Sequence, residues 1–507
     1  MTMQRYLQLK NGTDVRGVAV EGVEGQPVTL TEEIARNIAS AFCVWLAEKK
    51  GKDAVGVAVG YDSRISAPAL SKAVREGIVY AGGKAVDTGL STTPSMFMLL
   101  KDEKRQAAYP CDGSIMITAS HLPFNRNGLK FFTEDGGLES ADITQILTVA
   151  ANGVPEKSGG SFACAPYVDD YAAALVEKVR AATGEVSPLK GKKIVVDAGN
   201  GAGGFFAEKV LKPLGADTDG SQFLEPDGRF PNHIPNPEDG EAMRSVCQAV
   251  VEAKAEFGII FDTDVDRAGA VDERGEEINR NRLIALIAAI LLQEKKGTIV
   301  TDSVTSDGLA TFLQNAGGKH HRFKRGYKNV INEALRLNAA GEYAPLAIET
   351  SGHAALMENY FLDDGAYLIV RLLIALAKAS KEGKRLTDLI ADLPEAKEGK
   401  ELRVKFVQGV DFKTLGKQVI DEFACFISKQ AYAIPAKDNH EGFRVNFDKE
   451  HGDGWALLRM SLHDPNMPVN VESDSVGGVK VICKQLYDFL SAYSFLDLTA
   501  FENYLKA

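Results

Sequence analysis

The stretch Val55-Gly56-Val57-Ala58-Val59-Gly60-Tyr61-Asp62 is the clearest indication of the fold. Its small and β-branched residues predict a buried strand, and the terminal aspartate introduces a polar turn before a helical stretch. The same order of strand, aspartate, turn and helix recurs at Lys193-Ile194-Val195-Val196-Asp197 and at Gly297-Thr298-Ile299-Val300-Thr301-Asp302. Strands that alternate with helices indicate layered α/β structure, so three such units predict three α/β domains.

The length of the chain also requires several domains. It has 507 residues, whereas a single hydrophobic core stops growing at about 250–300 residues. The turn-rich stretch 151–160 and the break at 393–400 are the best candidate linkers, and the alternating segments beyond the second break indicate antiparallel strands. We therefore predict an α/β fold with three similar domains that have mixed sheets (1–155, 156–280 and 281–394), followed by a smaller α+β domain (395–507).

Composition excludes several classes of function. A net charge of −11 argues against binding to nucleic acid, which needs a broad basic face. The longest apolar run, Leu283 to Leu292, is far shorter than the ~20 residues of a membrane-spanning helix, and the N-terminus lacks an apolar signal segment. The six cysteines are scattered without a C-x-x-C pair, which indicates reduced thiols and no zinc site. We expect a cytoplasmic protein without a membrane or nucleic-acid partner.

A candidate nucleophile lies in Thr118-Ala119-Ser120-His121-Leu122-Pro123-Phe124-Asn125-Arg126-Asn127-Gly128-Leu129-Lys130. Pro123 and Asn127-Gly128 predict a loop, and a serine beside a histidine, with Lys130 after it, suits an exposed hydroxyl that does chemistry. Most isolated Ser-His pairs are incidental, so this loop needs support from other motifs.

That support comes from Phe261-Asp262-Thr263-Asp264-Val265-Asp266-Arg267, which follows an apolar strand. Three carboxylates at alternate positions repel one another unless a hard cation lies among them, and oxygen ligands suit Mg²⁺. The motif does not match an EF-hand, because the sixth position, counted from Asp262, needs a glycine and holds Arg267. A solvated acidic loop is the alternative interpretation.

A possible dinucleotide fingerprint needs separate consideration. Gly199-Asn200-Gly201-Ala202-Gly203-Gly204 satisfies G-x-G-x-x-G after a strand and before a helical stretch, and Asp217 and Asp219 follow at a suitable distance. However, the preceding strand already ends in Asp197 and the motif lies in the middle of the chain. We therefore interpret these glycines as packing devices for a close strand-to-helix turn.

Three further motifs carry groups that suit a sugar phosphate. Ile348-Glu349-Thr350-Ser351-Gly352-His353 combines an acceptor and a donor for sugar hydroxyls, although a plain polar turn is possible. The basic run from His321 to Lys328 is a plausible anion contact in an acidic protein. Arg459-Met460-Ser461-Leu462-His463-Asp464-Pro465 contains an arginine, whose forked guanidinium binds phosphate well.

In this order, the motifs resemble those of the α-D-phosphohexomutase superfamily, in particular bacterial phosphomannomutase/phosphoglucomutase. The family patterns are T-A-S-H-N-P with a later N-G and Lys, D-x-D-x-D-R, G-E-x-S-G-H and R-x-S-x-T-E-P. Gly12-Thr13-Asp14-Val15-Arg16-Gly17 and Gly60-Tyr61-Asp62-Ser63-Arg64 also resemble family segments, the second of which we interpret as structural. The chain departs from these patterns at Leu122, Ile348, His463 and Asp464.

The resemblance implies an isomerase that moves a phosphoryl group reversibly between the 1- and 6-positions of mannose or glucose phosphate. Ser120 would carry the phosphoryl group, and a hexose 1,6-bisphosphate would be the intermediate and activator. One Mg²⁺ per chain would be held by Ser120, Asp262, Asp264 and Asp266. The resemblance gives catalytic roles to Ser120, His121, Lys130, Arg16, Arg267 and either Lys324 or Lys328, and substrate contacts to Glu349, Ser351, His353, Arg459 and Ser461.

Three alternatives stay open from the sequence. The first is a phosphoglucosamine mutase, and the second is a sugar-phosphate-binding relative with little turnover, which the altered Arg459 motif suggests. A serine acyl hydrolase is more distant, because no G-x-S-x-G elbow surrounds Ser120. We expect a monomer or a homodimer.

Overall fold

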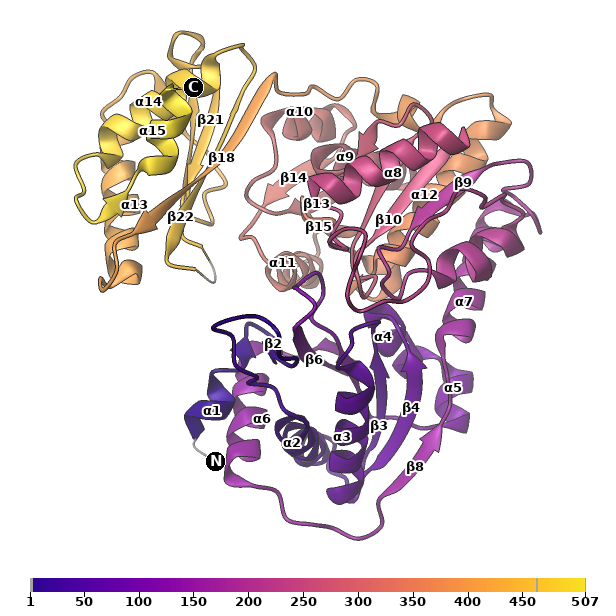
Figure 1. Ribbon diagram of the computed structural model, residues 1–507. Coiled ribbons are helices and arrows are strands. Elements are labelled where there is room, and N and C mark those ends of the chain that lie inside the picture. The colour runs from indigo at the N-terminus through magenta and orange to yellow at the C-terminus, as the bar shows by residue number, and fades with distance from the viewer. Residues whose placement is uncertain (1–2, 462–463, 507) are drawn as a thin grey trace. The chain divides into compact units, whose positions relative to one another are not determined.

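Figure 1 shows the computed structural model, which describes residues 3–461 and 464–506. The chain divides into two compact units. The first unit contains the chain up to Asn279 together with Ser351–Leu386. The second contains Arg280–Thr350 and the residues from Thr387 onward.

The first α/β domain is built on one mixed sheet with the strand order β1-β2-β6-β5-β3-β4-β8, and β7 pairs with β6. Its strands are β1 (Lys10–Asn11), β2 (Asp14–Val18), β3 (Gly56–Tyr61), β4 (Lys84–Leu90), β5 (Gly113–Ile117), β6 (Arg126–Thr133), β7 (Gly136–Gly137) and β8 (Ser161–Cys164). Its helices are α1 (Met3–Leu7), α2 (Glu32–Lys50), α3 (Ala67–Tyr80), α4 (Thr93–Lys101), α5 (Glu103–Ala108) and α6 (Ser140–Asn152).

Local chemistry explains these elements. Strand β3 is buried along almost its whole length because parallel neighbours, β4 and β5, flank it and helices cover the sheet. Helix α2 begins where Thr31 accepts a hydrogen bond from the Ile34 amide, and it ends at Gly51, whose φ of 63° is in the left-handed region. Helices α2, α3 and α6 bury their apolar sides in one core against β3 and β5 (Figure 1).

The second α/β region has a four-stranded sheet with the order β12-β11-β10-β9. Strand β9 (Ile194–Asp197) is parallel to β10 (Phe257–Phe261), while β11 (Ala268–Asp272) and β12 (Glu277–Ile278) form antiparallel pairs. Its helices are α7 (Val168–Thr183), the π-helix η1 (Phe206–Leu211), the 3₁₀-helix η2 (Lys212–Leu214) and α8 (Gly240–Ala253). The first unit also contains β16 (Ala354–Leu356), η3 (Met357–Asn359), β17 (Leu362–Asp363) and α12 (Gly365–Lys381).

The glycines of the possible dinucleotide fingerprint lie in the turn after β9 and pack tightly. A Cβ added to Gly201 would lie 2.7 Å from the carbonyl oxygen of Thr263, and one added to Gly204 would lie 2.1 Å from that of Leu224. The backbone approach therefore has no room for a side chain, which is the packing role that we expected.

The second unit begins with the helix α9 (Arg280–Glu294) and three parallel strands in the order β14-β13-β15. These are β13 (Thr298–Thr301), β14 (Lys319–Arg322) and β15 (Leu346–Ile348), with helices α10 (Asp307–Asn315) and α11 (Tyr327–Ala339) between them. The 3₁₀-helix η4 (Leu386–Ile390) precedes the C-terminal domain.

The C-terminal domain is a six-stranded antiparallel sheet with the order β19-β20-β21-β22-β18-β23, packed against helices. Its elements are β18 (Glu398–Phe406), α13 (Phe412–Ile427), β19 (Ala433–Pro435), β20 (Phe443–Phe447), η5 (Lys449–His451), β21 (Gly454–Leu458), β22 (Asn466–Ser473), α14 (Gly478–Leu490), β23 (Leu496–Asp497) and α15 (Thr499–Lys506). The predicted fold class, three α/β domains with mixed sheets and a smaller α+β domain, is confirmed.

Two local predictions were wrong. The expected loop after Ser120 is shorter than predicted, because β6 already begins at Arg126 and includes Asn127-Gly128. Gly128 pairs there with Arg16 of β2, where the strands come so close that a Cβ would lie 2.2 Å from the carbonyl oxygen of Val15. The predicted break at 393–400 is also shorter, since β18 begins at Glu398 and pairs with β22.

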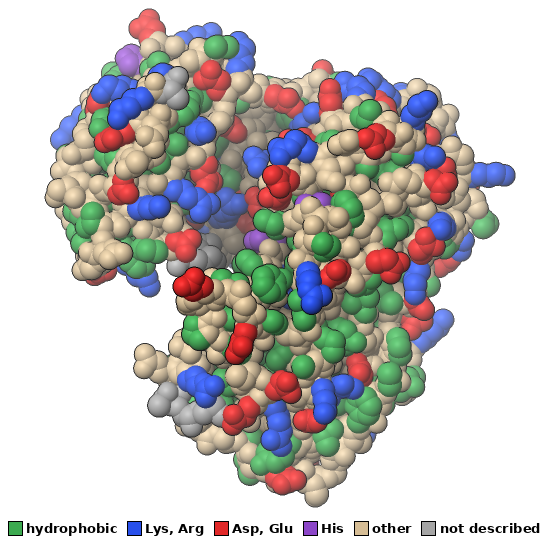
Figure 2. Space-filling model, viewed as in Figure 1, with side chains coloured by type: hydrophobic (Ala, Val, Ile, Leu, Met, Phe, Trp, Pro, Cys, Tyr) green, Lys and Arg blue, Asp and Glu red, His purple; other side chains and the backbone are tan. Residues whose placement is uncertain are grey.

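The surface carries both signs of charge. Figure 2 shows acidic and basic side chains interspersed over the displayed face. Among the described helices, none is long and apolar enough to cross a membrane.

Candidate active site

Ser120 follows β5 in a strained backbone conformation. Its φ is 51°, in the left-handed region that residues other than glycine rarely adopt, and its amide donates to Oγ1 of Thr118 at 2.9 Å. The residue is only 9% exposed, so the expectation of an exposed hydroxyl was wrong. The turn directs the hydroxyl into a polar cluster instead of toward open solvent.

Arg64 holds this turn from the inside. Its side chain is fully buried, and its guanidinium donates to four backbone carbonyls, those of Ser120, Leu122, Pro123 and Arg126. Asp62, also fully buried, lies 3.5 Å from Nε of Arg64. The structural role that we expected for the Gly60–Arg64 segment is therefore to shape the Ser120 loop.

The acidic loop connects β10 to β11 and brings three carboxylates together. One oxygen from each of Asp262, Asp264 and Asp266 lies within 4.8 Å of the others, and all three side chains are buried. Val265, within the loop, has a φ of 66°, which is unfavourable for a β-branched residue. This strained turn points the alternate carboxylates to the same side.

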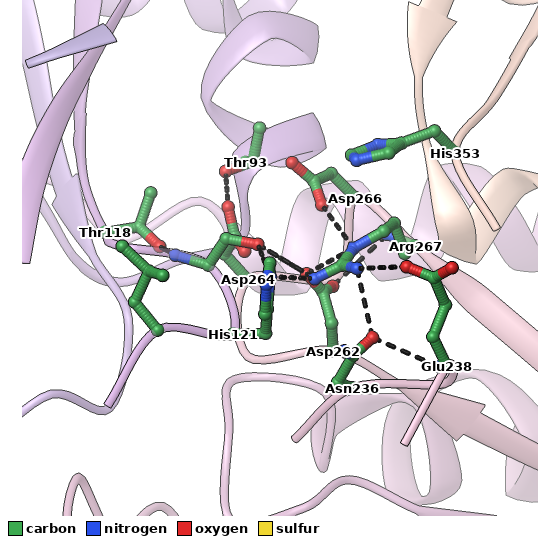
Figure 3. A network of polar contacts seen from close by, with 12 residues as sticks. Thr93, Thr118, His121, Asn236, Glu238, Asp262, Asp264, Asp266, Arg267 and His353 are labelled. Atoms are coloured by element: carbon green, nitrogen blue, oxygen red, sulfur yellow. Dashed lines mark hydrogen bonds and ion pairs between the residues drawn. The ribbon is translucent and has the colours of Figure 1, made fainter. Parts of the chain in front are cut away.

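Ser120 and the acidic loop meet in one hydrogen-bonded network. Figure 3 shows the part of it around Asp262 and Arg267. The Ser120 hydroxyl donates to Oδ2 of Asp262 at 3.1 Å and accepts from Nη2 of Arg267 at 3.0 Å. Arg267 also donates to Asp262 through Nε and Nη2, at 3.2 Å and 3.1 Å. The guanidinium lies 2.6 Å from Nδ1 of His121, and its other nitrogen, Nη1, donates to Asn236 at 3.0 Å.

Cations and hydroxyls surround the other two carboxylates. Lys130, on β6, donates to Asp264 at 3.2 Å and also to Asp266. The hydroxyl of Thr93, at the start of α4, donates to the Asp264 carboxylate, and the Thr93 amide donates to the Asp264 carbonyl at 2.8 Å. Arg16 reaches the loop two residues before Ser120, where its Nη1 donates to the carbonyl of Thr118 at 2.9 Å.

Burial and neighbouring charges shift the pKa values of the groups in this cluster in different directions. Burial and the charges of Asp266 and Asp264 raise the pKa of Asp262 well above its usual range. Burial also raises the pKa of Asp266, but Lys130, His353 and Arg267 outweigh it and hold that pKa well below the usual range. Burial and the charge of Arg267 lower the pKa of His121 to about 3, so this imidazole is neutral at pH 7.

His353 lies on the other side of Asp266. Its Nδ1 pairs with Asp363 of β17, and its backbone bridges to that of Arg267. Burial lowers the pKa of His353, but the charges of Asp363 and Asp266 outweigh it and raise the pKa to about 9. This imidazolium therefore adds positive charge beside the acidic loop.

The carboxylates suit a hard divalent cation. Among the described residues, Oδ1 of Asp264 and Oδ1 of Asp266 are buried and have no hydrogen-bond donor. A buried carboxylate oxygen without a partner is costly, and a cation with oxygen ligands would satisfy both atoms. The site thus fits a metal such as Mg²⁺.

The remaining predicted residues lie in the second unit, apart from Ser351, which is buried in the first. Glu349 is 3% exposed, and its carboxylate accepts from the Gly326 amide at 2.6 Å. Arg459 is buried directly after β21, and Ser461 lies two residues further on. Lys324 is exposed and Lys328 is partly exposed. His463, which replaces a threonine of the family motif, is outside the described residues.

The sequence does not indicate that several residues of the network belong to the site. Thr93, Asn236 and Glu238 contact the acidic loop or Arg267 from other elements, but none of them stands in a motif. Asn236 and Glu238 lie in a turn-rich stretch before α8, a pattern that many loops share. Only the packing of α4 and this loop against the acidic loop reveals them.

The site has the components that metal-dependent phosphoryl transfer needs. They are a buried serine hydroxyl, a carboxylate site for a hard cation, and arginine and lysine side chains around both. The family models for the phosphoglucomutase/phosphomannomutase alpha/beta/alpha domains I, II and III match residues 8–155, 167–275 and 279–396.

Two similar relatives cover almost the whole chain. The phosphoglucomutase of Neisseria gonorrhoeae is 31% identical over 91% of this chain and 93% of its own length. The phosphomannomutase/phosphoglucomutase of Pseudomonas putida is 29% identical over 91% of each chain. A crystal structure of a phosphoglucomutase/phosphomannomutase family protein from Burkholderia thailandensis aligns with a TM-score of 0.78 and 28% identity, over 97% of this chain and 98% of that one. The chain therefore belongs to the phosphoglucomutase/phosphomannomutase family of phosphohexomutases.

Proposed function

We propose that this protein transfers a phosphoryl group reversibly between the 1- and 6-positions of glucose or mannose phosphate. The observation that carries this function is the position of Ser120 Oγ, in contact with both Asp262 of the acidic loop and the guanidinium of Arg267. A phosphoryl group on this oxygen would lie beside a cation site and beside a fixed positive charge. Phosphoryl transfer needs this kind of electrostatic compensation more than covalent help from the protein.

Each residue of the network has a role in this scheme. Arg267 and Lys130 offset the negative charge that spreads over the transferred phosphoryl oxygens, and Arg16 orders the serine loop from the Thr118 carbonyl. His121 is a weak base because of its low pKa, so we assign it to orienting Arg267 through Nδ1. Lys130, Lys324 and Lys328 are the candidates for moving the proton of the sugar hydroxyl.

The acidic loop would hold one Mg²⁺ through Asp262, Asp264 and Asp266, with Ser120 as a further ligand. When bound, this ion would neutralise phosphoryl oxygens and make the serine oxygen a better leaving group. Thr93 and Lys130 would orient the carboxylates from behind.

Binding of the sugar and of its second phosphate is assigned to the remaining motifs. Glu349, Ser351 and His353 would contact hydroxyls, and Arg459 and Ser461 would bind the phosphate that is not transferred. A hexose 1,6-bisphosphate would form when Ser120 gives up its phosphoryl group, and it would return its other phosphate to Ser120. We propose the four domains as 1–155, 156–280, 281–394 and 395–507.

A mutase assay with Mg²⁺ and the 1-phosphates of glucose, mannose and glucosamine tests this function. Conversion of glucose or mannose 1-phosphate is expected, whereas a preference for the glucosamine substrate would identify a phosphoglucosamine mutase. Ser120→Ala should lose activity by about a thousandfold or more, because it removes the phosphoryl carrier. The exposed Ser158→Ala is the matched control. Activity retained in Ser120→Ala would contradict the mechanism, and a wild-type protein without turnover would identify a binding relative.

A further inference from the structure

The carboxylate of Glu441 occupies a cradle of hydrogen-bond donors in the second unit. Its Oε2 accepts from the hydroxyl of Ser303 at 2.5 Å and from the backbone amide of Arg325 at 3.0 Å. Its Oε1 lies 3.7 Å from Nη1 of Arg459, and its side chain is only 11% exposed. The carboxylate is therefore held by hydrogen bonds from a hydroxyl and an N–H group and by an ion pair with a guanidinium.

These three donors are the kind of set that binds a phosphate. Ser303 follows β13, Arg325 precedes α11 and Arg459 follows β21, so the donors converge from separate elements. A hydroxyl, a backbone N–H and a guanidinium together bind tetrahedral oxyanions in many proteins. Nε of Arg459 is buried and has no hydrogen-bond partner among the described residues, so Glu441 does not saturate the guanidinium.

The backbone around Glu441 keeps its side chain at this place. Gly442, the next residue, has a φ of 59°, and a Cβ on it would lie 2.2 Å from the carbonyl oxygen of Leu458. Arg444 then donates to the carbonyl of Ser303 at 3.0 Å and to the carboxylate of Asp307 at 2.9 Å. The turn that carries Glu441 is thus attached to the loop that carries Ser303.

We infer that Glu441 is a built-in occupant of the substrate's phosphate site, which competes with the incoming phosphate for Arg459, Ser303 and the Arg325 amide. This inference rests on the phosphate-binding role proposed for Arg459. A carboxylate and a phosphate dianion repel each other, so the substrate binds only when Glu441 has left the cradle. The apparent dissociation constant for the phosphate is then the intrinsic constant divided by the fraction of time for which the cradle is open, so a rarely open cradle binds weakly.

Such competition is useful to an enzyme that must release one phosphate and bind another at the same site. If this site bound phosphate too tightly, the bisphosphorylated sugar would stay in one orientation. Glu441 returns to the donors as the phosphate leaves, so the desolvated guanidinium of Arg459 does not lose all of its negative partners at once.

Glu441→Gln tests the inference, because the amide has nearly the same shape but no charge. We expect the KM for glucose 1-phosphate and the inhibition constant of inorganic phosphate both to fall about fivefold or more, since the occupant is weakened. Glu441→Ser, which removes the competing group altogether, should change both constants in the same direction. Glu422→Gln is the matched control, because the exposed Glu422 contacts Gln418 and Tyr493 instead.

A second variant separates this inference from the proposed function. Arg459→Gln should raise both constants by about tenfold or more, because a charged hydrogen-bond donor to phosphate is lost. Unchanged constants in Arg459→Gln would overturn the phosphate site itself. If Arg459→Gln weakens binding while both Glu441 variants leave it unchanged or weaker, Glu441 is only a clasp between the two loops, and the inference is wrong.

Discussion

At the scale of single residues, two strained positions shape the site. Ser120 and Val265 both have positive φ angles, although neither is a glycine. Such conformations cost about 1–3 kcal/mol each, and they persist because the surrounding hydrogen bonds determine them. At Ser120 these hydrogen bonds involve Thr118 and Arg64. They stabilise the strained turn in which the Ser120 hydroxyl contacts Asp262.

Arg267→Lys should lower kcat/KM by about a hundredfold. Lysine keeps the charge but cannot contact Asp262, Ser120 and Asn236 at once with a planar fork. Steady-state kinetics with glucose 1-phosphate checks this prediction. Arg274→Lys, at the exposed turn after β11, is the control, and equal activity in the two variants would contradict the role of Arg267.

Thr93→Val should weaken Mg²⁺ binding about tenfold, because partners behind a metal ligand orient it and have effects of this size. The variant removes the hydroxyl that donates to Asp264 but keeps the shape of the side chain. The Mg²⁺ concentration that gives half-maximal activity measures the effect, with Thr183→Val at the end of α7 as the control. An unchanged concentration dependence would exclude this role for Thr93.

At the scale of elements, strand ends and the segments between them converge on the site. The serine loop leaves β5, Lys130 lies in β6, and the acidic loop joins β10 to β11. Arg64, between β3 and α3, connects these segments because its guanidinium reaches carbonyls 56 to 62 residues further along the chain.

Arg64→Met should destabilise the protein by about 3–5 kcal/mol, because it leaves Asp62 buried without its partner. It should also lower activity, since the Ser120 turn loses its internal support. Unfolding in urea measures the first effect and the mutase assay the second. In the double variant Asp62→Asn/Arg64→Met the uncompensated charge is gone, so part of the stability should return. If it does not, the loss arises from the loop carbonyls alone.

The buried carboxyl group of Glu472, on β22, should make the stability of the protein depend on pH. Burial raises its pKa to about 7, although Trp455 donates to its carboxylate at 2.9 Å. Because the folded pKa lies above the ordinary value, the ionised form is disfavoured, and stability falls as the pH rises from about 4.5 to 7. Glu472→Gln should therefore gain stability relative to the wild type at pH 8 but not at pH 5. Melting temperatures at both pH values check this, and a difference that does not depend on pH would refute it.

At the scale of the whole molecule, metal removal should have two effects. The three carboxylates are buried together, so their repulsion is relieved when a cation binds. Chelation should abolish mutase activity and lower the melting temperature, and Mg²⁺ should restore both. At a hundred times its dissociation constant, the ion would stabilise the fold by about 2.7 kcal/mol. Asp262→Asn/Asp264→Asn should remove the Mg²⁺-dependent rise, and a rise that persists would place the metal elsewhere.

The sequence predicted the layers of the fold correctly, and it proposed the members of the site without their geometry. The run from Val55 to Asp62 predicted a buried strand, since apolar patterns act locally and report the burial of each element. The spacing of Asp262, Asp264 and Asp266 predicted a cation site for a similar reason, because the repulsion arises between near neighbours. The expected exposure of Ser120 was wrong, since exposure depends on segments that are distant in the sequence.

The sequence by itself determined the chemistry that this protein has available: a serine, an acidic cluster, a sugar-type loop and an arginine motif, in the order of their family. The tertiary structure alone decided their partners. Thr93 contacts Asp264 across 171 positions, and Ser303 contacts Glu441 across 138. Such pairs depend on strand register and on how helices and loops pack, which local residue preferences do not encode. The same physical fact explains why the support of Ser120 by Arg64 and the occupied phosphate cradle became visible only in the fold.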